Sequence, residues 1–186
     1  MLVNAHDAKN LPGRKTDVLD AAWLAHLDYN IAALGSGDPL LELGVYEPDQ
    51  RAALRQILTD LRARPVRQGV SHGDLSTRNL IADTAGGYVV LDWGSAIAGP
   101  VPWTDLELIQ RWHVTADPVS EVSANAWRAV LSGAGVSERT ADELIAELQI
   151  LHVLDVTRWA LDRRPDRIQE FVLQAREAIP RILARG

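Results

Sequence analysis

The sequence predicts a mainly α-helical fold that carries one small β-hairpin. Apolar residues make up 47% of the 186 residues, which is enough to form one sizeable core. Over most of the chain these residues recur at the three- and four-residue spacing of an amphipathic helix. Two short apolar runs, 80–82 and 88–91, are the exception. They are joined by the turn-forming residues 83–87 and therefore predict the hairpin.

The first third of the chain is predicted to hold two helices. Thr16 or Asp17 is a good N-cap for the first of them, and the glycine- and proline-containing segment 35–39 that follows is predicted to be a loop. The second helix is predicted to have Pro48 in its first turn and to end at Pro65. Its apolar positions repeat at helical spacing: Leu54, Ile57, Leu58 and Leu61.

The chain after Pro102 is predicted to be helical to its end. The first of four helices begins near Trp103, and the second ends before the glycine-containing segment 132–135. Ser137 is a good N-cap for a long third helix, and Pro165 opens the last one.

Composition and charge exclude several classes of function. The chain has no cysteine, which excludes disulfides, thiolate zinc sites and cysteine nucleophiles. Its formal net charge of −6 argues against a surface for nucleic acid or for anionic membranes, because both need clustered lysine and arginine. Neither a signal peptide nor an apolar span of about 18 residues is recognisable. The expected location is the cytoplasm.

Three polar residues near the predicted hairpin have the separations of a phosphoryl-transfer site. Asp74 and Asn79 are separated like the base and the metal-binding amide in the catalytic loop of protein kinases. Asp92 follows the second strand of the hairpin, and because a hairpin returns the chain to its starting point, Asp92 can meet Asn79 across a metal ion. Carboxylate and amide oxygens suit Mg²⁺. We therefore expect the three side chains to converge around one cation.

The residues around these three resemble the aminoglycoside phosphotransferase family. The resemblance is carried by His72-Gly73-Asp74 with Asn79, by Leu91-Asp92-Trp93, by Gly99-Pro100 and by Asp105-Leu106. Members of this family are small-molecule kinases with a protein-kinase-like (α+β) fold. Residues 38–186 are similar to the C-terminal lobe of that fold in the order of their elements. The resemblance implies transfer of the γ-phosphate of ATP to a hydroxyl group of a substrate.

The resemblance also implies a role for each of these residues. Asp74 would be the catalytic base, and His72 would orient the catalytic loop. Asn79 and Asp92 would hold Mg²⁺ and, through it, ATP. Asp105 would anchor a helix behind the site. As an acid in the first turn of a helix, however, Asp105 is equally well explained by its interaction with the helix dipole.

Other residues near the motif have simpler explanations than a role in catalysis. Ser76 and Arg78 could contact substrate or phosphate, but solvated loop positions explain them better. The remaining histidines lack the spacing of metal ligands, which argues against a metallohydrolase. Five tryptophans are interpreted as core packing rather than as a stacking surface: Trp93, Trp103, Trp112, Trp127 and Trp159.

The N-terminal residues resemble a different family. Residues 4–25 are similar to a stretch of a DEDD-type insertion-sequence transposase, whose two aspartates in this stretch bind metal and correspond to Asp17 and Asp20. Solvated acids at the start of a helix explain both residues better, and a nuclease function is not carried over. We predict two parts: residues 1–37, a transposase-like fragment and junction, and residues 38–186, the phosphotransferase C-terminal lobe.

The residues before His72 lack the nucleotide-binding features of a kinase. They contain no strand–glycine turn–strand unit followed by a lysine, which kinases use to hold the triphosphate. The N-terminal lobe is therefore expected to be lacking, and the enzyme to be truncated and impaired. The alternative is a catalytically silent remnant or binding module that arose from a fused reading frame.

The expected partners are a small molecule with a hydroxyl group and a second copy of the chain. From Trp103 onward the sequence holds 13 acidic residues and 10 arginines, which mildly favours a cationic substrate. Loss of the N-terminal lobe would expose the apolar upper surface of the C-terminal lobe, and exposed apolar surface of this kind favours self-association.

Overall fold

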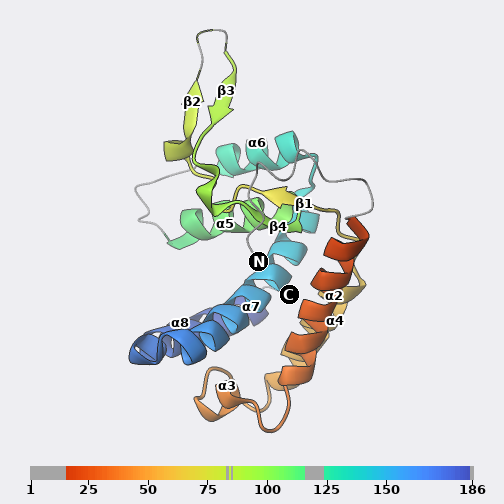
Figure 1. Cartoon of the computed structure of the whole chain (residues 1–186), viewed down its shortest axis with the longest axis vertical. Coiled ribbons are helices and arrows are strands. Elements are labelled where there is room, and N and C mark those ends of the chain that lie inside the picture. Colours follow the sequence, from red (N-terminus) through yellow and green to blue (C-terminus); the bar gives the residue numbers. More distant parts are fainter. Residues whose placement is uncertain (1–15, 83, 85, 116–123, 185–186) are drawn as a thin grey trace. The chain divides into compact units, whose positions relative to one another are not determined.

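The computed structural model describes residues 16–82, 84, 86–115 and 124–184 (Figure 1). The fold is mainly helical with small antiparallel sheets, which confirms the predicted fold class. Contacts divide the chain into two compact units. Unit 1 comprises the described part of Met1–Ala22 together with Pro65–Ala141, and unit 2 comprises Trp23–Arg64 together with the described residues from Asp142 onward.

Some of the predicted features lie outside the described residues. This applies to residues 1–15, which include most of the transposase-like stretch, and to residues 116–123. It also applies to the side chains of Asp17 and Trp112. The side chain of Asp20 is exposed. The division into a transposase-like part and a phosphotransferase part concerns ancestry and stays a prediction.

Three helices differ from their predicted limits. One of them, α6 (Ala124–Ala134), continues through residues 132–134, which were predicted to lie beyond its end. Helix α2 (Thr16–Ala33) continues beyond the predicted apolar stretch. Helix α4 (Arg51–Ala63) starts after Pro48, so this proline lies in the preceding turn instead of the first helical turn. The others are α3 (Pro39–Glu42), which was not predicted, α5 (Trp103–Thr115), α7 (Glu138–Arg163) and α8 (Ile168–Leu183). Ser137 caps α7, as predicted, by accepting a hydrogen bond from the Thr140 N–H at 3.2 Å.

Unit 1 contains both sheets. The predicted hairpin consists of β2 (Leu80–Ala82) and β3 (Tyr88–Val90), and Figure 1 shows it extending away from α5 and from the second sheet. The second sheet pairs β1 (Gln68–Ser71) with β4 (Ile97–Pro100) in antiparallel register, so that Ser71 lies opposite Ile97. This sheet was not predicted, since its strands are short and far apart in the sequence.

Unit 2 is a helical assembly whose helices are joined by ion pairs and hydrogen bonds. Arg62 pairs with Asp28, and Arg55 donates to the carbonyl of Ile31, so α2 and α4 run antiparallel. Arg64 joins α4 to Glu147 of α7 at 2.7 Å. The core contains large apolar side chains with no exposed surface, including three of the four predicted on α4: Leu27, Leu54, Leu58, Leu61, Ile145, Leu154 and Ile179.

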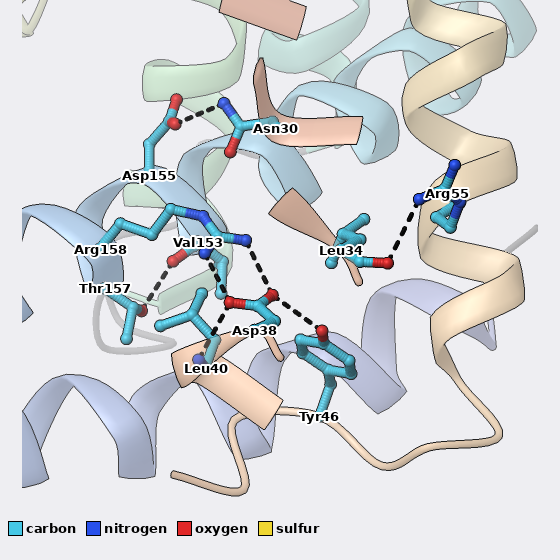
Figure 2. Close-up of polar contacts among 10 residues, drawn as sticks. All are labelled: Asn30, Leu34, Asp38, Leu40, Tyr46, Arg55, Val153, Asp155, Thr157 and Arg158. Atoms are coloured by element: carbon cyan, nitrogen blue, oxygen red, sulfur yellow. Dashed lines mark hydrogen bonds and ion pairs between the residues drawn. The ribbon is translucent and has the colours of Figure 1, made fainter. Parts of the chain in front are cut away.

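A buried polar cluster lies between α3 and α7 in unit 2 (Figure 2). Asp38 caps α3 by accepting a hydrogen bond from the Leu40 N–H at 3.1 Å, and it accepts another from the Tyr46 hydroxyl at 2.8 Å. Arg158 of α7 binds both carboxylate oxygens, at 2.7 and 2.9 Å. The Asp38 side chain is fully buried. Burial raises the pKa of Asp38, but the hydrogen bonds from Arg158, Tyr46 and Leu40 outweigh it, so that the pKa is lowered.

Within the described residues, no helix combines the length and the apolar character that a membrane-spanning segment requires.

Candidate active site

The predicted catalytic loop begins where β1 ends, in unit 1. β1 leads directly into His72, and β4 begins five residues after Asp92. Because Ser71 and Ile97 pair across the sheet, the start of the loop lies beside the end of the segment that carries Asp92. The β1–β4 sheet thus brings together two chain segments whose paired residues Ser71 and Ile97 are 26 positions apart in the sequence.

Asp105, in the first turn of α5, binds the backbone at the start of the loop. Its Oδ2 accepts a hydrogen bond from the His72 N–H and its Oδ1 accepts one from the Gly73 N–H, both at 2.9 Å. A carboxylate that accepts two backbone N–H groups holds the chain in one orientation, since both oxygens are fixed. The contact places Asp105 against the predicted catalytic loop, in addition to its place at the helix N-terminus, and its implied role as the anchor of a helix stays a prediction.

His72 connects the loop to the segment that precedes Asp92. Only 2% of the residue is exposed. Its Nε2 lies 2.7 Å from the carbonyl oxygen of Leu91, and its Nδ1 lies 3.2 Å from the backbone nitrogen of Asp74. A carbonyl can only accept a hydrogen bond and a backbone N–H can only donate one. These two contacts fit the tautomer with its proton on Nε2, in which Nδ1 holds Asp74 by accepting that N–H.

Asp74 and Asn79 lie in contact. The side-chain nitrogen of Asn79 donates to the backbone carbonyl of Asp74 at 2.8 Å and to the Asp74 carboxylate at 3.3 Å. These two bonds occupy the amide nitrogen of Asn79 and leave its amide oxygen for another partner. A short 3₁₀ helix at Thr77–Asn79 turns the chain, so that the side chain of Asn79 lies beside Asp74.

Asp92 follows Leu91, whose backbone is hydrogen-bonded to the loop that carries Asp74 and Asn79. The Leu91 N–H donates to the Asn79 carbonyl at 2.8 Å, and the Leu91 carbonyl accepts from His72. Asp92 itself has left-handed backbone angles, φ 58° and ψ 62°, which are uncommon for an aspartate. Its side chain is exposed and makes no hydrogen bond or ion pair with Asp74 or Asn79 among the described residues. Convergence of all three oxygens on one cation stays a prediction.

The chemistry of this group suits a magnesium ion better than a transition metal. Among the described residues, no three His, Cys, Asp or Glu side chains are grouped so that they could hold a metal ion. Magnesium does not require such a cage, because it keeps several waters and is bound by one or two carboxylates together with phosphate oxygens. The amide oxygen of Asn79, which has no partner among the described residues, and the exposed carboxylate of Asp92 are oxygen donors of this kind.

The structure adds one neighbour to the site and corrects the interpretation of two tryptophans. The Trp93 ring lies 4.8 Å from the His72 ring, centroid to centroid, yet 45% of the residue is exposed. Trp159 is 51% exposed and contacts Phe171 through a ring edge. Both tryptophans were predicted to be core residues. Each packs against one neighbouring ring but leaves about half of its surface exposed. Ser76 has a buried hydroxyl without a partner among the described residues, and Arg78 is exposed.

A comparison with protein families identifies the class of this chain. The model of the phosphotransferase enzyme family (APH) matches residues 6–136, which is well over half of the chain and includes every predicted site residue. The chain therefore belongs to this family. The match begins at residue 6, within residues 4–25, whose resemblance to a transposase stays a prediction. Neither the curated proteins nor the solved structures contain a match to this chain.

Proposed function

We propose that this chain is a kinase domain that transfers the γ-phosphate of ATP to a hydroxyl group of a small molecule. The observation that carries the proposal is the contact between Asn79 and Asp74, in a loop whose backbone is bound by Asp105. Phosphoryl transfer asks the protein mainly for positioned groups that neutralise charge, and a fixed acid–amide pair meets that need. Membership of the phosphotransferase enzyme family supports the same reaction class.

Each site residue has a distinct task in this proposal. Asp74 accepts the proton of the attacking hydroxyl. His72 positions Asp74 through its backbone N–H, and Asp105 positions the loop. Asn79 and Asp92 would hold Mg²⁺, which supplies neutralisation of the charge on the phosphates of ATP when it is bound. The acceptor is a small molecule with a hydroxyl group, and the acidic excess after Trp103 favours a cationic one.

The proposed location of the protein is the cytoplasm. Slow turnover is expected of this chain on its own. In the described residues before His72, the structure has helices α2, α3 and α4 and strand β1. The sequence there lacks the glycine-rich hairpin and the lysine that bind the triphosphate in kinases. Each missing electrostatic partner typically costs about 10²–10³ in rate. The alternative is a catalytically silent remnant or binding module from a fused reading frame.

Magnesium-dependent binding and turnover of ATP distinguish the two functions. We expect Mg-ATP to bind in isothermal titration calorimetry and ADP to form when a panel of cationic hydroxyl compounds is supplied. Asp74→Asn should retain binding but reduce ADP formation about 10²–10⁴-fold, because the proton acceptor is lost. Asp92→Asn should weaken binding of Mg-ATP, because a ligand of the ion is lost.

The matched control is Asp162→Asn, which removes an exposed carboxylate of α7 in unit 2 and should change neither property. Absence of Mg-ATP binding to the unaltered protein would exclude the kinase and leave the silent remnant. Equal turnover by the Asp74→Asn variant would show that another group accepts the proton.

We also propose that the chain associates with a second copy through the β2–β3 hairpin. The hairpin exposes apolar side chains on both faces: Leu80, Ile81, Tyr88 and Val89 are 37–72% exposed. Both strands also have an unpaired edge among the described residues, and such edges pair with identical edges. The double variant Ile81→Lys/Val89→Lys, which places charge on one face, should convert a dimer into a monomer in sedimentation experiments. A monomeric unaltered protein at high concentration would exclude this association.

A further inference from the structure

A hollow in unit 2 has the chemistry of an anion-binding site. It lies between the C-terminal end of α2, the following loop and one face of α4, and its volume is about 650 Å³. Volumes of this size accommodate small-molecule ligands. The side chains that line it include two arginines, two hydroxyl groups and an amide, but no acid: Ser36, Arg51, Arg55, Gln56 and Thr59.

The two arginines lie one helical turn apart on α4, and both line the hollow. Arg55 is held by its Nη1, which donates to the carbonyls of Ile31 at 2.8 Å and Leu34 at 3.3 Å (Figure 2 shows the second). Its Nε and Nη2 donors are not used in these bonds. Arg51, which is half-buried, has no hydrogen bond or ion pair within the part of the chain that the structure describes. A guanidinium without a carboxylate partner beside a hollow favours an anionic ligand.

The N-terminus of α4 adds positive potential on the same side. Arg51 and Ala52, which line the hollow, form the first turn of this helix. The turn contains no acid, and the preceding Gln50 does not cap it, because the Gln50 side chain accepts from the Glu47 N–H instead. The first N–H groups of a helix are unpaired and favour negative charge. Glu47 and Asp49 precede the helix, but they are exposed and do not line the hollow.

We infer that this hollow binds the phosphate group of a small phosphorylated molecule. Guanidinium groups donate two parallel hydrogen bonds to phosphate oxygens, and a helix N-terminus supplies backbone donors to the same group. The remaining volume is lined by the apolar surfaces of Pro48 and Ala52, which can cover the rest of such a ligand. The site lies in unit 2, whereas the catalytic loop lies in unit 1, so the inference does not depend on the proposed kinase activity.

Titration with inorganic pyrophosphate tests the inference. The full chain is titrated by calorimetry at low ionic strength in EDTA, which removes Mg²⁺ and with it ligand binding that requires the predicted magnesium site. We expect saturable binding at one site, and shifts of the Gly35, Ser36 and Thr59 amide resonances in ¹H–¹⁵N spectra. Arg51→Gln should raise the Kd at least about tenfold, since a charge-assisted hydrogen bond is lost.

Two control variants make the test specific. Arg163→Gln removes the same charge from an exposed position in the last turn of α7, in the same unit, and should leave the Kd unchanged. Asp74→Asn should also leave it unchanged, which separates this site from the catalytic loop. Equal weakening by Arg51→Gln and Arg163→Gln would show non-specific attraction and overturn the inference. Absence of saturable binding, or tighter binding of citrate than of pyrophosphate, would overturn it as well.

Discussion

Replacing Asp38 with alanine is expected to lower the free energy of unfolding by about 3–5 kcal/mol. The change removes a fully buried carboxylate that accepts hydrogen bonds from Arg158, Tyr46 and the Leu40 N–H. The Arg158 side chain, only 13% exposed, would then keep a buried positive charge without its partner. An unpaired buried charge is strongly destabilising, because it has lost both water and its counter-charge. Urea unfolding followed by circular dichroism measures the difference.

Two further variants identify the cause of this loss. Asp28→Ala breaks the exposed ion pair with Arg62 in the same unit and should destabilise the protein much less than Asp38→Ala, because water screens an exposed pair. The double variant Asp38→Ala/Arg158→Met should recover part of the stability lost in Asp38→Ala, since no unpaired charge is left. If Asp28→Ala and Asp38→Ala destabilise the protein equally, burial does not determine the strength of the Asp38–Arg158 pair.

Low pH should remove the contribution of Asp38. Because hydrogen bonds lower the pKa of Asp38 below its ordinary value of 3.8, the ion pair contributes stability that is fully present above that value. The contribution is lost as the pH falls through the lowered pKa of the folded protein. The difference in stability between the unaltered protein and Asp38→Ala should therefore be constant near neutral pH and should shrink only below about pH 3.8.

Replacing Gly73 with alanine is expected to displace the catalytic loop and to abolish the proposed phosphoryl transfer. Gly73 has a φ of 78°, a region that side chains disfavour, and a Cβ at this position would lie 2.1 Å from the backbone oxygen of Ser95. Backbone atoms cannot yield as a flexible side chain does. The Gly73 N–H would therefore move away from Asp105, and His72 and Asp74 on either side would move with it.

Gly135→Ala is the matched control for this substitution. Gly135 also lies in unit 1 and has a φ of 70°, but a Cβ there would meet no atom within 4 Å. This variant should lose only the conformational preference, about 1–2 kcal/mol, and should retain turnover. Gly73→Ala should lose more stability in urea unfolding and should lose ADP formation. Equal effects of the two substitutions would show that the backbone angle, and not the contact with Ser95, determines the role of Gly73.

Local patterns in the sequence predicted the elements whose causes are local. Leu54, Leu58 and Leu61 identified α4 because a helical stripe requires only neighbouring turns. Ser137 identified the start of α7 because an N-cap acts within four residues. The hairpin followed from its turn residues, and its register joins Ile81 to Val89. In contrast, Pro48 is equally suited to a turn and to a first helical turn, so the start of α4 was placed too early.

The sequence named the members of the candidate site, whose catalytic roles stay predictions, but it did not indicate the contacts between them. The separations of Asp74, Asn79 and Asp92 in the sequence indicated phosphoryl transfer. No local signal, however, indicated that Leu91 would bind both His72 and Asn79. The exposure of Trp93 was equally unpredictable, because the apolar spacing of a residue does not report how many of its faces are covered.

The sequence by itself determined the helical composition of this protein, its hairpin and its membership of a phosphotransferase family. These follow from periodicity, turn chemistry and a short motif, all of which act between residues close in the chain. The tertiary structure alone decided the β1–β4 sheet, the hold of Asp105 on the loop and the burial of Asp38 against Arg158. These contacts join residues between 26 and 120 positions apart, and their stability depends on the removal of water from both partners.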